Sequence, residues 1–520
     1  MSNHFYHFRK YRLTVFNAHS LCACSVPFFF CLGVLCHRRG GMVPTSMLQH
    51  ASNHDVVVLL VALSLSQLSG VWARAQSEKV EGGDTAVTLA DIQRLGEANL
   101  DDATRSYIAS GADQEQTLRE NTAAFMRLRF RPKVLVDVSK INTATTVLGR
   151  RISFPVGFSP SAAHQIADPV GELGTLDPPF HGVLMCFGTN IQAMEVSAYR
   201  HNRSLRRRKC PAWASGKRSR RQPIPTLSGA AARDAGTLMI VSAMSTTSLE
   251  DIRANAPDCL LWQQTYIFAN RSLTESLVRR AERQGFAAVV VTADSPVAGQ
   301  AVSLGMNKFV LPEGLSFANL EASWPGKSFT FDPSSEDFVG NLLSPSATWD
   351  DLRWLRSIST LPIVVKGVLT AGEALTAYQN GASAILVSNH GARQLDGDPA
   401  TIEALPEVVA AVGDRMEVYL DGGVRSGADA VKALSIGARA VFVGRPVLWG
   451  LAYKGKEGVD KVLDILRSEF NRTIQLLGVP DAKNLCTDFV VREQYYAQAL
   501  PRNCAPKHPW GDWVEYKVAV

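Results

Sequence analysis

The sequence predicts an α/β protein whose main domain is a (β/α)8 TIM barrel, with an N-terminal helical extension and a long loop after the fourth strand. Eight short apolar runs, rich in Val, Ile and Leu, recur along the chain, and segments with helical periodicity separate most of them. Near-continuous apolar runs are typical of parallel strands that are buried on both faces. Eight such units favour a closed barrel over an open sheet, and 520 residues accommodate one barrel plus extensions.

The first 86 residues do not have the pattern of a folded domain. They contain two apolar runs, Leu21–Cys36 and Val56–Ala73, each at or below the length that spans a bilayer. Ala73-Arg74-Ala75 resembles a signal-peptidase site, which fits better if translation begins at Met42 or Met47. The alternative that we favour is a poorly defined leader or a gene-model extension.

The pattern from Ala86 to Asp113 is helical and amphipathic, and strands alternate with helices after it. The strands are expected at Pro155–Phe158, Leu238–Val241, Leu260–Gln264, Ala287–Thr292, Pro362–Lys366, Ala384–Val387, Glu417–Leu420 and Ala440–Val443. Helices are expected at Leu273–Gln284, Ala371–Asn380, Thr401–Val412 and Gly427–Ile436. Ser272, with Glu275 three residues on, has the spacing of a capping box that begins the first of these helices.

Two connections are unusually long. Residues 303–350 contain Ser, Pro and Gly and are expected to form an active-site loop. Residues 176–228 interrupt a helix that is expected to begin at Gly171 and to end at Gly236, and they carry ten Lys or Arg but two Asp or Glu. They are either a basic insertion that binds an anionic partner or, as we favour, translated non-coding or disordered sequence. The barrel is expected over 87–495, with a C-terminal tail at 496–520.

Charge and cysteine content exclude some classes of function. The formal net charge of +6 is concentrated in residues 1–86 and 176–228, so the rest of the chain is net acidic and predicts no nucleic-acid partner. Six of the nine cysteines also lie in these two segments. The other three, Cys259, Cys486 and Cys504, have no metal-like spacing. We therefore expect no metal site and no disulfide framework, as in a reducing compartment.

Polar residues end or follow every predicted strand, where the site of such a barrel lies. They are Ser159-Pro160-Ser161, Ser242, Gln264, Thr292, Lys366, Ser388-Asn389-His390, Asp421-Gly422-Gly423 and Gly444-Arg445. The turns after the last two strands suit a phosphate, because bare backbone amides and Arg forks match phosphate oxygens. Lys366 is expected to point at a ligand, although a surface ion pair is the alternative.

The loop after the sixth strand combines two complementary groups. His390 can take a proton near neutral pH, and Arg393 can hold a carboxylate with two parallel hydrogen bonds. A lone histidine is more often structural, but a His-Gly-x-Arg sequence directly after a barrel strand indicates a site.

At these residues the chain resembles the FMN-dependent 2-hydroxy-acid oxidases and dehydrogenases, of which glycolate oxidase is the familiar member. The signature is Ser388-Asn389-His390-Gly391-Ala392-Arg393-Gln394, supported by Val365-Lys366-Gly367 and Asp421-Gly422-Gly423-Val424-Arg425. The heptapeptide is highly specific, and the resemblance runs from about residue 87 to about 490, apart from 176–228.

The resemblance implies a role for each matching residue. His390 would be the base that removes the substrate hydroxyl proton, Asp294 would pair with it, and Lys366 would lie beside the flavin N1/C2 carbonyl. Arg393 would bind the substrate carboxylate, and Tyr107 and Tyr266 would hydrogen-bond the substrate. FMN would be contacted through its ring or ribityl chain by Pro160, Ser161, Ala162, Ser242, Gln264, Thr292, Ser388 and Asp421, and through its phosphate by Gly422, Gly423, Arg425, Gly444 and Arg445.

The implied reaction is oxidation of an (S)-2-hydroxy acid to a 2-oxo acid, after which reduced FMN passes electrons to O2 and yields hydrogen peroxide. Hydride transfer and a carbanion route both remain open. The alternatives are a dehydrogenase with another electron acceptor, although no haem-binding domain is readable, and a catalytically impaired flavin-binding relative. The resemblance also implies a tetramer and a peroxisomal or cytoplasmic location, although the C-terminus lacks a Ser-Lys-Leu-like ending.

Two positions depart from the family pattern. Ala301 stands where the family usually has an Arg that assists the substrate carboxylate, and losing such a contact costs on the order of 1.5–3 kcal/mol. Met244 stands where glycolate oxidase has a Trp that shapes the substrate pocket. A flexible Met leaves room for a bulkier substrate, so we expect an acid other than glycolate, of medium or long chain.

Overall fold

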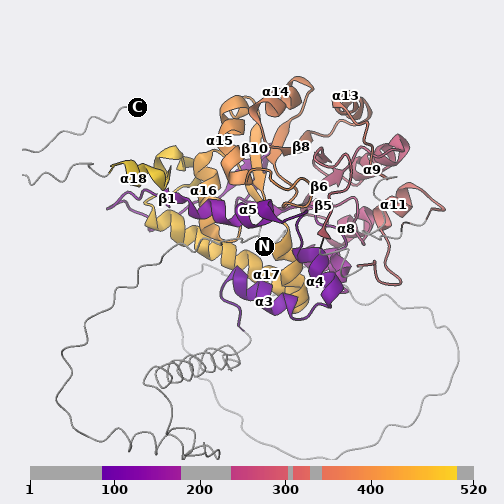
Figure 1. Ribbon diagram of the computed structural model, residues 1–520, viewed down its shortest axis with the longest axis horizontal. Coiled ribbons are helices and arrows are strands. Elements are labelled where there is room, and N and C mark those ends of the chain that lie inside the picture. Colours follow the sequence, from indigo (N-terminus) through magenta and orange to yellow (C-terminus); the bar gives the residue numbers. More distant parts are fainter. Residues whose placement is uncertain (1–84, 177–235, 303–308, 328, 330–341, 500–520) are drawn as a thin grey trace, which may run out of the picture. The chain divides into compact units, whose positions relative to one another are not determined.

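The computed structural model describes residues 85–176, 236–302, 309–327, 329 and 342–499, and these form the predicted closed barrel of eight parallel strands (Figure 1). The strands are β4 Val156–Phe158, β5 Leu238–Val241, β6 Leu260–Thr265, β7 Val289–Thr292, β8 Ile363–Val368, β9 Ala384–Val387, β10 Glu417–Asp421 and β11 Val441–Val443. They pair in chain order, and β11 closes the barrel against β4. All eight predicted strands are confirmed, with ends within two residues of those observed.

Helices surround the barrel, as Figure 1 shows for α14, α15 and α16. The helices are α3 Leu89–Glu97, α4 Asp102–Ala109, α5 Gln116–Met126, α6 Gly171–Leu176, α8 Leu249–Asn255, α9 Arg271–Arg283, α11 Ala318–Ser323, α13 Trp349–Ile358, α14 Ala371–Gln379, α15 Thr401–Val412, α16 Gly427–Ile436, α17 Arg445–Leu476 and α18 Gln494–Ala499. The predicted helices corresponding to α14, α15 and α16 are confirmed to within one residue. Short 3-10 turns lie at His164–Ile166, Ala482–Asn484 and Thr487–Phe489.

Two helix starts differ from the sequence-based expectation. The N-cap of α9 is Asn270, whose side chain accepts the backbone N–H of Ser272 at 3.1 Å, so the capping box predicted at Ser272 is wrong. An amide oxygen two residues earlier accepts one of the free N–H groups of the first turn instead. The N-terminal helical segment is two helices, because the side chain of Asp101 accepts the N–H of Thr104 at 2.9 Å and starts α4 anew.

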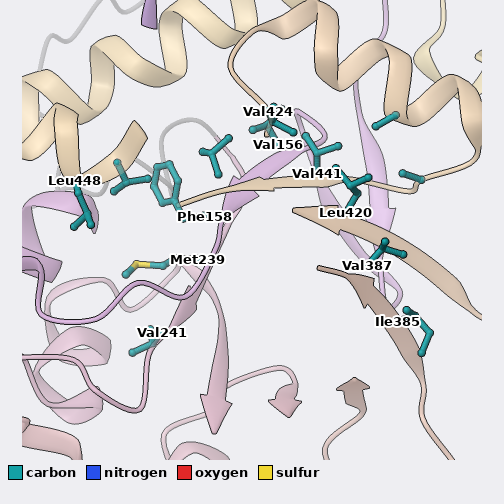
Figure 2. Packing of buried hydrophobic residues seen from close by; sticks show 14 of the residues in the cluster. Val156, Phe158, Met239, Val241, Ile385, Val387, Leu420, Val424, Val441 and Leu448 are labelled. Atoms are coloured by element: carbon teal, nitrogen blue, oxygen red, sulfur yellow. The ribbon is translucent and has the colours of Figure 1, made fainter. Parts of the chain in front are cut away.

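The core has two layers that follow from the two-residue period of a strand. In β9, Ala384 and Leu386 face the barrel interior, whereas Ile385 and Val387 face the surrounding helices. Figure 2 shows this outer layer, in which Val156 and Phe158 of β4 pack with residues of the neighbouring strands. Both faces of each strand are buried, which explains the near-continuous apolar runs of the sequence.

The end of the barrel at which the strands begin is covered by a hairpin. Strands β2 Thr145–Val147 and β3 Arg150–Ile152 pair antiparallel, and Val147 and Ile152 join the interior core cluster. Another antiparallel pair, β1 Leu128–Phe130 with β12 Val490–Arg492, links the two ends of the described chain. The hairpin does not cover the other end of the barrel, where the carboxyl ends of the strands meet, so that end is available for a site.

The long connection after β7 is more ordered than the predicted loop. It contains α11, and Phe317 and Leu320 are fully buried. Leu343 forms a β-bridge with Phe268. These apolar residues anchor the described part of the connection to the barrel, and Val302 and Leu343 at its two ends line the cavity described below.

Several expectations fall outside the described residues. They concern the leader up to residue 84, the basic segment from residue 177 onward with the helix end expected near Gly236, and the tail from residue 500. Among the described helices, none is both long and apolar enough to cross a membrane.

Candidate active site

A cavity of about 570 Å³ lies at the carboxyl ends of the barrel strands. Nearly all the predicted site residues line it. These are Tyr107, Pro160, Ser161, Ala162, Ser242, Gln264, Tyr266, Thr292, Lys366, His390, Arg393, Asp421, Gly422, Gly423, Arg425, Gly444 and Arg445. The two others, Asp294 and Ser388, lie directly behind the lining: Asp294 contacts His390 and Lys366, and the Ser388 hydroxyl accepts the backbone N–H of His390 at 3.1 Å.

Three charged or titratable side chains from consecutive strand ends meet at the cavity wall, with Asp294 behind Lys366 and His390. The Nδ1 atom of His390 lies 2.7 Å from Oδ1 of Asp294, and Nζ of Lys366 lies 3.4 Å from Oδ2 of the same carboxylate. The bond to Asp294 favours the proton on Nδ1, which leaves the Nε2 lone pair of a neutral His390 available as a base. Ser295, which was not among the predicted site residues, donates to Asp294 at 2.9 Å and lies 3.3 Å from His390 Nδ1.

The surroundings set the charge states of this group. Burial alone would raise the pKa of Asp294, but the Lys366 ammonium and His390 together hold that pKa well below its usual range. Burial and the Lys366 ammonium lower the pKa of His390, and Asp294 only partly opposes them. A carboxylate beside a neutral imidazole is the arrangement that a general base requires at neutral pH.

The loop after β9 holds His390 in an unusual backbone conformation. His390 and Ala392 have φ angles of 56° and 63°, in the left-handed region that non-glycine residues seldom adopt. Gln394 ties this loop to the loop after β7: it accepts the N–H of Gly299 at 2.8 Å and donates to the Asp294 carbonyl at 3.0 Å. The heptapeptide includes Gln394, but its part in joining the two loops was not predicted.

The carboxyl end of α4 holds two of the cavity arginines. Arg393 donates to the Tyr107 carbonyl at 2.7 Å, and its guanidinium lies 5.0 Å from the centre of the Tyr107 ring. Arg445 donates to the carbonyls of Ile108 and Ser110 at 2.9 and 2.8 Å. Helix carbonyls carry partial negative charge, so α4 holds both guanidinium groups at the cavity through neutral hydrogen-bond acceptors.

Three arginines make the cavity suitable for an anion. Arg393, Arg425 and Arg445 line it, and within the described residues none of them forms an ion pair with a carboxylate. Burial lowers the pKa of Arg425 to about 10, and burial together with Arg393 and Arg425 lowers that of Arg445. Gly423 has a φ of 81°, and a Cβ there would lie 1.9 Å from the Asn121 carbonyl oxygen, so only glycine fits this turn.

Two polar features fit the remaining parts of FMN. Asp421 accepts the Ser159 hydroxyl at 2.8 Å through Oδ2, but its buried Oδ1 has no partner. A buried carboxylate oxygen without a donor is costly, and a ribityl hydroxyl would supply that donor. The amide of Gln264 is fixed by Ala243 and Thr292, so its orientation toward the cavity is set before any ligand binds. With the arginines and the glycine turn, the lining fits a phosphorylated polyol such as FMN.

Met244 and Ala301, the two departures from the family pattern, both line the cavity. Both side chains therefore lie where they can affect substrate binding. Met244 is buried and Ala301 is half-buried. Their side chains bring no charge or hydrogen-bond donor to this part of the wall.

Comparison with known proteins identifies what this chain is similar to. The family model of the FMN-dependent dehydrogenases matches residues 96–199 and 224–492. Human 2-hydroxyacid oxidase 1 is 37% identical over 401 residues, which are 76% of this chain and 94% of that protein. The L-lactate oxidase of a Nostoc species is 39% identical over 414 residues, covering 78% of this chain and 98% of that protein.

Solved structures give the same result. A mandelate oxidase superimposes with a TM-score of 0.62 at 33% identity, covering 76% of this chain and 96% of the other. A soluble mutant of the membrane-associated (S)-mandelate dehydrogenase from Pseudomonas putida has a TM-score of 0.63 at 29% identity, covering 79% of this chain and all of the other.

Proposed function

Because the chain belongs to the family of FMN-dependent 2-hydroxy-acid oxidases and dehydrogenases, we propose that it oxidises a 2-hydroxy acid to a 2-oxo acid with O2 as the electron acceptor. The overall reaction converts the acid and O2 into the 2-oxo acid and hydrogen peroxide, which balances two electrons and two protons. FMN, when bound, supplies the two-electron oxidation that no side chain provides.

One observation carries the proposal: a neutral histidine and an unpaired guanidinium share one loop and one cavity. We assign to Arg393 the binding of the substrate carboxylate, because its guanidinium lines the cavity and has no acidic partner among the described residues. His390 then takes the proton of the adjacent hydroxyl. Asp294, at 2.7 Å, stabilises the imidazolium that results.

The other lining residues position the substrate and cofactor. Burial raises the pKa of both Tyr107 and Tyr266, so each phenol stays protonated and can donate a hydrogen bond to substrate. Lys366 lines the cavity, where its ammonium group would stabilise negative charge on FMN. Arg425, Gly423 and the first turn of α17 would hold the phosphate.

The relatives support an oxidase, since two of them are named 2-hydroxyacid oxidase and L-lactate oxidase. The (S)-mandelate dehydrogenase among the similar structures supports the same first half-reaction with a different acceptor. The identity of the acceptor is therefore the part of the proposal that most needs an experiment.

The test uses the full chain loaded with FMN. Mixing with 2-hydroxy acids without O2 should bleach the flavin absorbance, and admitting air should restore it with one peroxide formed per flavin. Bleaching that air does not reverse would indicate a dehydrogenase. His390→Ala should bind FMN with an unchanged spectrum and fail to bleach; bleaching at the normal rate would contradict the assignment of the base.

The compartment and the assembly are further proposals that rest on the family alone. We propose a peroxisomal or cytoplasmic location, tested by the distribution of a fluorescent fusion, and a homotetramer, tested by light scattering of the purified protein.

A further inference from the structure

Four apolar side chains reach the cavity from three consecutive strand ends: Met244 follows β5, Leu343 pairs with Phe268 after β6, and Ala301 and Val302 follow β7. Met244, Ala301, Val302 and Leu343, here called the apolar subsite, all line the cavity. Leu343 is 3% exposed and Met244 8%, whereas Val302 is 50% exposed. The subsite therefore combines buried side chains with one that is half exposed to solvent.

The backbone of the subsite is fixed although its longest side chain is flexible. The N–H of Met244 donates to the Ser242 hydroxyl at 3.1 Å, and its carbonyl accepts the N–H of Ala163 at 3.0 Å. The bridge between Leu343 and Phe268 fixes the backbone of Leu343. An unbranched Met adapts its shape to a ligand without movement of the backbone.

The chemistry of the subsite excludes a polar substrate tail. Its four side chains offer neither charge nor hydrogen bond, so a second carboxylate or a hydroxyl placed against them would lose its hydration without compensation. A hydrogen atom or a methyl group, as in glycolate or lactate, would leave the subsite largely unfilled. An alkyl chain would bury its surface there and continue outward past Val302.

Building on the proposed function, we propose that the substrate is a 2-hydroxy acid with an unbranched apolar side chain of about four or more carbons, and that Met244 and Ala301 determine this specificity. Each methylene buried in the subsite should raise kcat/KM roughly three- to fourfold. The increase should stop once further methylenes extend beyond Val302 into solvent.

The experiment compares glycolate, lactate, 2-hydroxybutyrate, 2-hydroxyhexanoate, 2-hydroxyoctanoate and mandelate with the FMN-loaded chain, measured as the anaerobic rate of flavin reduction. A rise with chain length that reaches a plateau supports the proposal. Rates that are flat, fall with length, or are highest for mandelate overturn it while leaving the oxidation chemistry intact. Reduction by none of the acids contradicts the proposed function instead.

Binding of unreactive carboxylates tests the subsite without turnover. Butanoate, hexanoate and octanoate should perturb the flavin spectrum with Kd values that fall roughly three- to fourfold per methylene. Equal Kd values would overturn the subsite even if the chain turns over no acid.

Two variants locate the effect. Met244→Trp, which fills the subsite, should lower the ratio of 2-hydroxyoctanoate to lactate kcat/KM at least tenfold. If Met244→Trp does not fold, Ala301→Phe provides the same test, because Ala301 is half-buried and its position tolerates a larger side chain. Met126→Trp on α5, where Met126 is 65% exposed, is the matched control and should leave the ratio unchanged. An unchanged ratio in both subsite variants would overturn the proposal.

Discussion

Replacement of Asp294 by Asn tests how the charge behind the cavity supports the proposed base. The carboxylate lies 2.7 Å from His390 Nδ1 and 3.4 Å from Lys366 Nζ, so the amide would remove the charge that balances both. Removing one partner of a buried ion pair costs about 3–5 kcal/mol. If that cost falls on the state in which His390 carries the proton, flavin reduction slows roughly a hundred- to several-thousandfold.

Anaerobic stopped-flow spectroscopy measures this rate directly, with substrate at saturation so that binding does not limit it. The flavin spectrum before mixing shows whether the Asp294→Asn variant still holds FMN. Asp414→Asn, at an aspartate whose side chain is 78% exposed, is the matched control and should keep the normal rate. If the Asp294→Asn variant retains FMN and its rate of flavin reduction falls less than fivefold, Asp294 does not stabilise the protonated His390 as proposed.

Three further predictions follow from the site geometry. In the native chain the acidic limb of the kcat/KM profile should lie below pH 6.5, because burial and Lys366 lower the pKa of His390 and the base stays neutral until the pH falls through that lowered value. In Lys366→Gln the acidic limb should move to higher pH, and an unmoved limb would exclude Lys366 as a cause of the lowered pKa. Asp421→Leu removes the buried unpaired oxygen, so FMN affinity measured by fluorescence titration should fall about tenfold or more; unchanged affinity would show that this oxygen does not contact FMN. Gly423→Ala should lower the free energy of unfolding by more than about 2 kcal/mol, whereas Gly149→Ala, with a similar φ of 76° but open space around it, should cost only about 1 kcal/mol; equal losses would mean that the predicted clash is relieved.

The barrel was predictable because each strand carries its own evidence. Parallel strands buried on both faces must be apolar throughout, and runs such as Ala384–Val387 show this without knowledge of their neighbours. The end of β8 was predicted two residues too early. The strand continues through Gly367 to Val368 across a register irregularity, and nothing in the local apolar pattern marks that continuation.

The candidate site was predictable in composition but not in all its contacts. The heptapeptide and the glycine turns identify the loops, and barrel topology brings their ends together. The sequence did not indicate that the Arg445 guanidinium donates to the carboxyl end of α4, more than 300 residues earlier in the chain, or that Gln394 joins two loops. Such contacts depend on how loops approach one another in space, and no local pattern encodes them.

The most direct measurement of the central claim is a single turnover without O2. FMN-loaded protein is mixed with an excess of 2-hydroxyoctanoate, and the bleached flavin and the 2-oxo acid formed are quantified together. We expect one 2-oxo acid per flavin reduced in the native chain, and neither reduced flavin nor 2-oxo acid in His390→Ala. Flavin that stays oxidised with every 2-hydroxy acid, although FMN is bound, would contradict the account.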